Sequence, residues 1–177
     1  YATDASAYRE VPRAVVYPKN KSDIKQVINW AAANKSSVIP RTAGTSLAGQ
    51  VVGGGVVVDV SRYLTNVIEL NKNERWVKVE PGVILDELNM LLEPDNLFFG
   101  PETSTSSRCM MGGMVGNNSC GSHSIIYGTT RDHTLEIEAV LSDGSEVVFK
   151  DITKSEFDAK CSLESLEGDI YRHIRNE

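Results

Sequence analysis

Glycine is concentrated in two segments of this 177-residue chain, and that distribution most constrains what the chain can fold into. Of the 14 glycines, five lie in residues 40–55 and six in residues 100–128. Glycine permits positive φ angles and lets a ligand approach the main chain closely, and successive amide N–H groups in such segments can point at one anion. The two segments therefore predict an anion-binding site made largely of backbone.

Neutral donors accompany these glycines. The first segment carries the hydroxyls of Thr42, Thr45 and Ser46, the second carries five hydroxyls in residues 103–107, and each segment holds only one arginine. Desolvated amide and hydroxyl bonds suit a buried diphosphate better than a salt-sensitive phosphate patch. Either segment alone could be a surface loop. Two segments of matching chemistry favour one shared ligand.

The common phosphate motifs do not fit the first segment. Gly44 and Gly49 have the spacing of a Walker A loop, but Gln50-Val51 follows them where lysine and Ser/Thr would be required. No Gly-x-Gly-x-x-Gly opens a helix after a strand, so the Rossmann fingerprint is also missing. We therefore expect a nucleotide site of another design.

Hydrophobic periodicity predicts a mixture of strands and helices. A helix is expected after Ser22, as a candidate N-cap, through Asn34, and another between Pro81 and Pro94, whose leucines form an apolar stripe that includes Leu91. Asp143-Gly144 predicts a hairpin turn. The fold class expected is α+β, with a turn and a helical tail over 151–177. Strands are expected at 13–18, 37–40, 56–60, 66–70, 75–80, 135–141 and 146–149.

Composition excludes several functions. The net charge is −6 and no Lys/Arg block occurs, so neither nucleic acid nor an anionic membrane surface is an expected partner. No apolar run approaches the roughly 20 residues that span a bilayer. The odd set Cys109, Cys120 and Cys161 lacks Cys-x-x-Cys spacing and the histidines form no ligand pattern, so we expect a reducing cytoplasm and no metal.

Specific motifs then point to a family. Residues 40–50 closely resemble the diphosphate loop of the FAD-linked oxidases, the PCMH-type or vanillyl-alcohol-oxidase-like flavoproteins. Further segments resemble that family's second FAD-contacting region in order: 100–102, 112–121, 127–132 and 140–144, with Thr3–Ser6 also similar near the start. Among subfamilies, the chain is most similar to the glycolate oxidase, D-lactate dehydrogenase and D-2-hydroxyglutarate dehydrogenase group.

The resemblance implies a PCMH-type FAD-binding fold in which two α+β subdomains clamp the cofactor, one with short parallel strands and the other with a more antiparallel sheet. Residues 1–150 would form this domain, with subdomains at about 11–70 and 71–150, and 151–177 would lead to a substrate domain that this chain lacks.

The resemblance also implies a set of FAD contacts. Residues 41–47 and Gln50 would hold the diphosphate, and later residues would run toward the flavin ring. Thr45 stands where some members attach FAD to histidine, so FAD is expected to be non-covalent. Met110-Met111 stands where relatives show Thr-Ile, which removes one hydroxyl donor. The expected contacts are Arg41, Thr42, Ala43, Gly44, Thr45, Ser46, Leu47, Gln50, Pro101, Glu102, Ser106, Cys109, Gly112, Gly113, Asn117, Asn118, Ser119, Gly121, Ser124, Tyr127, Gly128 and Ile137.

The expected reaction is oxidation of a small-molecule D-2-hydroxy acid to the 2-oxo acid by hydride transfer to FAD. Electrons would leave to a downstream acceptor, for which an iron–sulfur domain or subunit is a candidate, and the protein could be peripheral to the inner membrane. No catalytic residue is assigned; the cluster Arg131-Asp132-His133 is a candidate whose alternative is structural capping. Two other functions stay open: an FAD enzyme of this fold with another substrate, such as a cell-wall precursor reductase, and a non-catalytic nucleotide-binding module.

Overall fold

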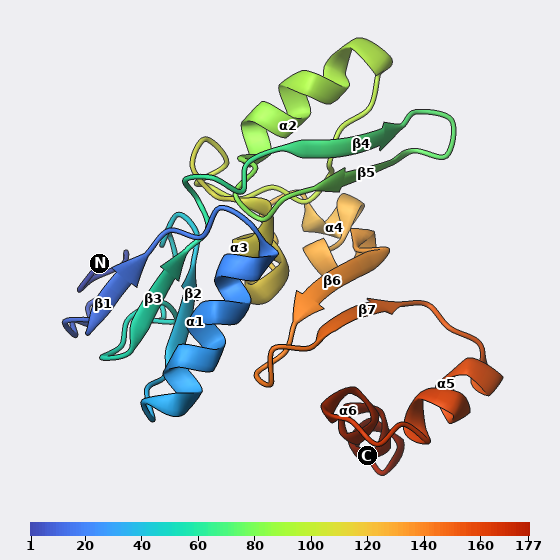
Figure 1. Ribbon diagram of the computed structural model, residues 1–177. Coiled ribbons are helices and arrows are strands. Elements are labelled where there is room, and N and C mark those ends of the chain that lie inside the picture. Colours follow the sequence, from blue (N-terminus) through green and yellow to red (C-terminus); the bar gives the residue numbers. More distant parts are fainter. The chain divides into compact units, whose positions relative to one another are not determined.

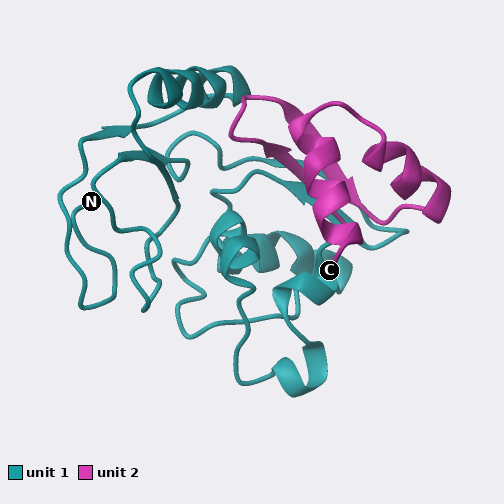
Figure 2. Ribbon diagram, turned by 90° about the horizontal axis from the view of Figure 1, so that it is seen from below, with its two compact units in different colours: residues 1–134 teal, residues 135–177 magenta.

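The computed structural model describes residues 1–177, which separate into two units, residues 1–134 and residues 135–177 (Figure 2). The first unit contains both glycine-rich segments, and the second contains a β-hairpin followed by two helices. The subdomain limits expected near residues 70 and 150 stay predictions.

A three-stranded parallel sheet of order β1-β3-β2 begins the first unit (Figure 1). Its strands are β1 (Ala14–Val16), β2 (Val38–Arg41) and β3 (Val56–Asp59). The β-branched run of β3 is buried at every position, which confirms the prediction of a central strand. Because the strands are parallel, their carboxyl ends lie at one edge, and the first glycine-rich segment leaves the sheet there from Arg41.

Helix α1 (Lys21–Ala33) packs against this sheet through Ile24 and Val27. The N-cap prediction was wrong by two residues. Asn20, rather than Ser22, caps the helix, because the Asn20 Oδ1 atom accepts the amide of Asp23 at 3.0 Å. Asn and Ser are comparable N-caps, so the sequence alone could not choose between them.

A separate hydrophobic core forms where helix α2 (Leu85–Leu92) packs against an antiparallel hairpin. The hairpin consists of β4 (Val67–Asn71) and β5 (Trp76–Val79) (Figure 1). Leu85, Leu88 and Leu92 are buried as the apolar stripe predicts, but Leu91 was wrongly placed in that stripe. It is 46% exposed, because its position on the helix turns it away from the hairpin. After α2, the short 3₁₀ helix η1 (Glu93–Asp95) ends the element.

Part of the second glycine-rich segment is helical, which the sequence analysis missed. Helix α3 (Met111–Asn117) contains three glycines, and the short helices α4 (Ser124–Tyr127) and η2 (Thr130–His133) follow. Glycine disfavours a helix interior. Here Met111 and Met114 lie on one face of α3 and are buried in the core with Leu85 and Leu88, and that burial stabilises the helix despite its glycines.

In the second unit, β6 (Glu136–Val140) and β7 (Glu146–Lys150) form an antiparallel hairpin closed at Gly144, as predicted. Helices α5 (Lys154–Cys161) and α6 (Leu166–Arg175) confirm the helical tail. No helix has the length and apolar character needed to cross a membrane. No group of three or more His, Cys, Asp or Glu side chains is placed to hold a metal ion.

Candidate cofactor-binding site

Hydrogen bonds between neutral side chains join the two glycine-rich segments. The Gln50 amide nitrogen Nε2 donates to Asn117 Oδ1 at 2.9 Å, across 67 residues of sequence. On one side Ser46 Oγ donates to Gln50 Oε1, and on the other Asn117 Nδ2 donates to Ser119 Oγ at 3.0 Å. This chain of amides and hydroxyls brings together residues from distant parts of the sequence that were predicted for one site.

A second contact shows how closely the segments approach. A Cβ atom placed on Gly113 would lie 2.5 Å from Thr42 Oγ1, so a side chain here would require the Thr42 hydroxyl to turn away. Gly44 adopts φ +68°, a left-handed conformation that turns the first segment back on itself. The local geometry is thus an amide-rich turn against a short helix.

Residues 101–102 pack against residues 121–124. A Cβ on Gly121 would lie 2.2 Å from the carbonyl oxygen of Glu102. The Glu102 carboxylate accepts from Ser122 Oγ at 3.1 Å and lies 2.7 Å from His123 Nδ1, while the Gly121 amide donates to Ser124 Oγ at 2.9 Å. Three of the predicted contacts, Glu102, Gly121 and Ser124, are therefore neighbours, and Pro101, which precedes Glu102, is fully buried.

The candidate cluster Arg131-Asp132-His133 has structural partners. The Asp132 carboxylate accepts the amide and hydroxyl of Thr129, and these bonds lower the pKa of Asp132. The Arg131 amide donates to Asn118 Oδ1 at 2.9 Å. His133 Nε2 lies 2.5 Å from the carbonyl oxygen of Tyr127. These contacts support the capping alternative, and they hold Asn118 and Tyr127 in place.

Three predicted contacts are not joined to this arrangement by the bonds described above. The Cys109 side chain is 5% exposed, and its sulfur contacts Met114 Sδ at 3.6 Å, so the thiol belongs to the core. Ser106 uses its carbonyl oxygen to accept the amide of Asp86 at 3.3 Å. Ile137 belongs to β6 in the second unit. The remaining predicted residues gather in the first unit, on residues 41–50, on α3 and on the segment that ends at Gly128.

Residues 1–10 contact the first segment, and the sequence analysis did not assign them to the site. The Ala5 amide donates to the Gly44 carbonyl oxygen at 3.2 Å, and Arg41 Nη1 donates to the Thr3 carbonyl oxygen at 2.9 Å. The similarity of Thr3–Ser6 to the family was the available signal, but spacing alone could not show that these residues reach a loop about 40 positions later.

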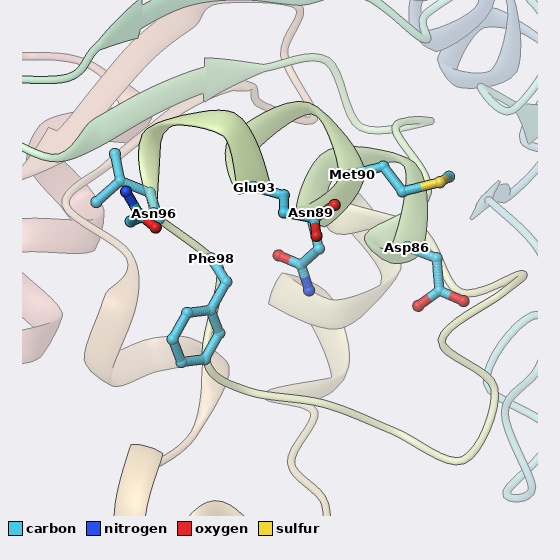
Figure 3. A pocket seen from close by; sticks show the side chains of 7 residues that line it. Asp86, Asn89, Met90, Glu93, Asn96 and Phe98 are labelled. Atoms are coloured by element: carbon cyan, nitrogen blue, oxygen red, sulfur yellow. The ribbon is translucent and has the colours of Figure 1, made fainter.

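A surface pocket along α2 contains none of the predicted cofactor contacts (Figure 3). In this view Asp86, Met90 and Glu93 lie along the helix, and Phe98 lies on the chain that follows it. Asn89 Oδ1 accepts the Phe99 amide at 2.8 Å, which holds the chain after the helix. The pocket is lined by Asp86, Asn89, Met90, Glu93, Asn96, Leu97 and Phe98.

Comparison with known proteins identifies the family. A family model described as FAD binding domain matches residues 12–150. The chain belongs to this FAD binding domain family. The assignment confirms the resemblance to the PCMH-type FAD-linked oxidases that the glycine-rich segments indicated.

Named relatives agree with this assignment. A D-2-hydroxyglutarate dehydrogenase of Pseudomonas putida is 38% identical over 177 residues, which is 98% of this chain and 18% of that protein. Its Escherichia coli K12 counterpart is 44% identical over 146 residues, 81% of this chain and 14% of that protein. The chain therefore spans less than a fifth of the length of these relatives.

A solved structure shares the fold. Xylooligosaccharide oxidase from Myceliophthora thermophila C1 superposes with a TM-score of 0.74 and 24% identity, covering 88% of this chain and 33% of that one. This similarity confirms the predicted PCMH-type α+β fold.

Proposed function

We propose that the two glycine-rich segments hold the diphosphate and the adjoining part of one non-covalently bound FAD. The observation that carries the proposal is the Gln50–Asn117 hydrogen bond, together with the contact of Gly113 on Thr42. They bring two amide-rich segments to one place, and a single extended ligand is the simplest group that needs both.

The chemistry of the residues fits this ligand. The positive φ of Gly44 opens the first segment to a close approach by an anion. The surrounding side chains are hydroxyls and amides, which can donate to phosphate oxygens without introducing a desolvated charge. In our proposal residues 42–47 and Gln50 hold the diphosphate, and Gly113, Asn117 and Ser119 continue along the cofactor.

Non-covalent attachment is supported by Thr45, because this position offers no histidine to form a bond to the flavin. A carboxamide or hydroxyl environment of this kind holds FAD through many modest hydrogen bonds. Denaturation should therefore release free FAD into the supernatant.

For the whole protein, we propose oxidation of a D-2-hydroxy acid to the 2-oxo acid. Bound FAD would accept the hydride from the α-carbon. The similarity to D-2-hydroxyglutarate dehydrogenases supports this substrate class. The residues described here bind and orient the cofactor, and the base that removes the hydroxyl proton is outside the set that they form. Electron transfer to a further acceptor, with an iron–sulfur group as a candidate, belongs to the same proposal.

Titration with FAD tests the site. Gly44→Val in the full-length protein should raise the Kd for FAD by about a hundredfold, since a branched side chain at positive φ closes the turn. Gly116→Ala is the matched control, because a Cβ at Gly116 meets nothing within 4 Å. A Gly44→Val protein that binds FAD as the control does would remove the first segment from the site.

Reduction of the bound flavin tests the reaction. Glycolate, D-lactate and D-2-hydroxyglutarate should be added separately to the full-length holoprotein under anaerobic conditions. Bleaching of the flavin absorbance by one of them supports the proposed substrate class. Failure of all three, with FAD bound, would contradict the reaction while leaving the cofactor site intact.

A further inference from the structure

The first ten residues fold into a small structure of their own. Thr3 and Arg9 form an antiparallel bridge, and the Glu10 amide donates to the Ala2 carbonyl oxygen at 2.9 Å. Inside this turn, Asp4 Oδ1 accepts the Ser6 amide at 2.8 Å. We call residues 1–10 the N-terminal strap. Its shape is set by its own hydrogen bonds.

The N-terminal strap is fastened to the carboxyl edge of the parallel sheet. Tyr1 Oη donates to Asp59 Oδ2 at 2.6 Å and lies 2.9 Å from Tyr17 Oη. Asp59, which ends the central strand β3, is only 4% exposed. Burial, followed by the hydrogen bonds to Asp59 and Tyr17, raises the pKa of Tyr1, so the hydroxyl stays a donor.

The same strap contacts the first glycine-rich segment at both of its left-handed glycines. The Ala5 amide donates to the carbonyl oxygen of Gly44, and the Tyr8 ring lies so close to Gly49 that a Cβ there would be 2.6 Å from Tyr8 Cδ2. These contacts fall on the two turns that shape the segment. A strap held to the sheet at one end therefore restrains the segment at the other.

The Arg41 side chain also links strap and segment. Its guanidinium donates to the Thr3 carbonyl oxygen, stacks at 5.2 Å on the Tyr1 ring, and fills the space beneath Gly44, where a Cβ would lie 2.4 Å from Nη2. Asp4 Oδ2 is buried without a hydrogen-bond partner, and the positive charge of Arg41 acts on this carboxylate. The cation of Arg41 is thus engaged by the strap.

We infer that Arg41 is a positioning residue, through which the N-terminal strap holds the first glycine-rich segment in the conformation that binds the diphosphate. The inference rests on the proposed FAD site. It assigns Arg41 an indirect role in place of the direct contact expected from the family resemblance. The segment binds with neutral donors, and the strap supplies its rigidity.

Three variants of the full-length protein test the inference. Arg41→Met removes the bond to Thr3 and the stacked cation, and Tyr1→Phe removes the hydroxyl bonds while keeping the ring. Arg62→Met is the matched control: Arg62 stacks on Tyr17 and Tyr63 near the same sheet edge, and neither ring belongs to the strap or to the segment. Fluorescence titration with FAD at low and high salt, and the melting temperature of each apoprotein, are the measurements.

Arg41→Met should raise the Kd for FAD about tenfold and Tyr1→Phe about threefold, while Arg62→Met stays within about twofold of wild type. The salt dependence of the Kd should be equal in Arg41→Met and wild type, because the guanidinium does not pair with the diphosphate. If Arg41→Met fails to fold, Tyr1→Phe carries the comparison with Arg62→Met.

Two results would overturn the inference. The first is that Arg41→Met or Tyr1→Phe binds FAD as tightly as Arg62→Met does, while Gly44→Val no longer binds FAD. In that case the FAD site exists but does not depend on the strap. The other is a flattened salt dependence in Arg41→Met, which would make Arg41 a direct partner of the diphosphate. Wild-type protein that binds no FAD would instead overturn the site and the strap together.

Discussion

The two glycine-rich segments, which we propose bind one FAD together, have different structural support. The first, residues 40–55, contains the left-handed glycines Gly44 and Gly49 and is braced by a strap about 40 residues earlier in the chain. The second is built around α3, whose Met111 and Met114 are part of the hydrophobic core. This difference teaches that glycine supplies conformational freedom in one segment and close packing in the other. Substitutions should therefore separate cofactor affinity from stability.

The largest loss of stability is expected in the second segment. In Gly112→Ala the new Cβ would lie 2.5 Å from Pro81 Cβ and 3.1 Å from Pro81 backbone atoms, which cannot move away easily. We expect the free energy of unfolding to fall by about 2 kcal/mol. Gly116→Ala, on the same helix but in open space, should raise it by about 0.5 kcal/mol. Urea denaturation measures the free energy of unfolding of both variants. Equal values would contradict the view that glycine allows close packing in the second segment.

Gly44→Ala should weaken FAD binding more than it lowers the stability of the fold. An L-residue at φ +68° costs about 1 kcal/mol, and the new Cβ meets the end of the Arg41 side chain, which can move aside by giving up its exposed bond to Thr3. The Kd for FAD should rise about tenfold, more than Gly112→Ala raises it in protein that remains folded. Denaturation and FAD titration of the two variants side by side check this. A larger loss of stability in Gly44→Ala than in Gly112→Ala would contradict it.

A smaller effect is expected where the segments meet. Gln50→Ala and Asn117→Ala, alone and combined, form a double-mutant cycle on the 2.9 Å bond. In the absence of FAD, we expect a coupling energy of about 0.5 kcal/mol, because the pair is exposed and water competes for both amides. If the losses of unfolding free energy in the two single variants simply add in the double variant, the bond contributes nothing. Packing at Gly113 alone would then bring the segments together.

The smallest expected effect is on how the stability of the fold depends on pH. Burial of Asp4 acts against ionisation, but the hydrogen bonds from the Ser6 hydroxyl and amide outweigh it, and with Arg41 they lower the pKa of Asp4. A carboxyl whose folded pKa is lowered stabilises the fold above its unfolded pKa, and that stabilisation is lost as pH falls through the folded value. The melting temperature of wild type should therefore fall more steeply than that of Asp4→Asn below about pH 4. Parallel curves would exclude this contribution.

Several elements followed from sequence because their signals are local. The β-branched run 56–60 predicted a central strand, Asp143-Gly144 predicted the hairpin turn, and the glycine-rich segments with their neighbouring motifs pointed to the FAD-linked oxidases. Each of these signals lies within a few residues and depends on backbone propensity or on a motif. They required no knowledge of which distant residues become neighbours.

Other features depended on contacts that no local pattern records. The sequence suggested loops at 111–117, where burial of Met111 and Met114 makes a helix. It also gave no sign that the Cys109 thiol packs on Met114. In both cases the free energy of burying side chains in a shared core outweighed the preference expected of the local sequence.

By itself, the sequence determined the α+β class, the strands and the presence of two amide-rich segments able to bind a phosphate, because glycine, hydroxyl and hydrophobic patterns act over short distances. Only the tertiary structure decided that Gln50 meets Asn117, that Arg41 turns toward the N-terminal strap, and that α3 approaches Thr42 through Gly113. These contacts join residues 38 to 71 positions apart. Their formation depends on how two cores fold the chain back on itself, and short-range spacing carries no information on that.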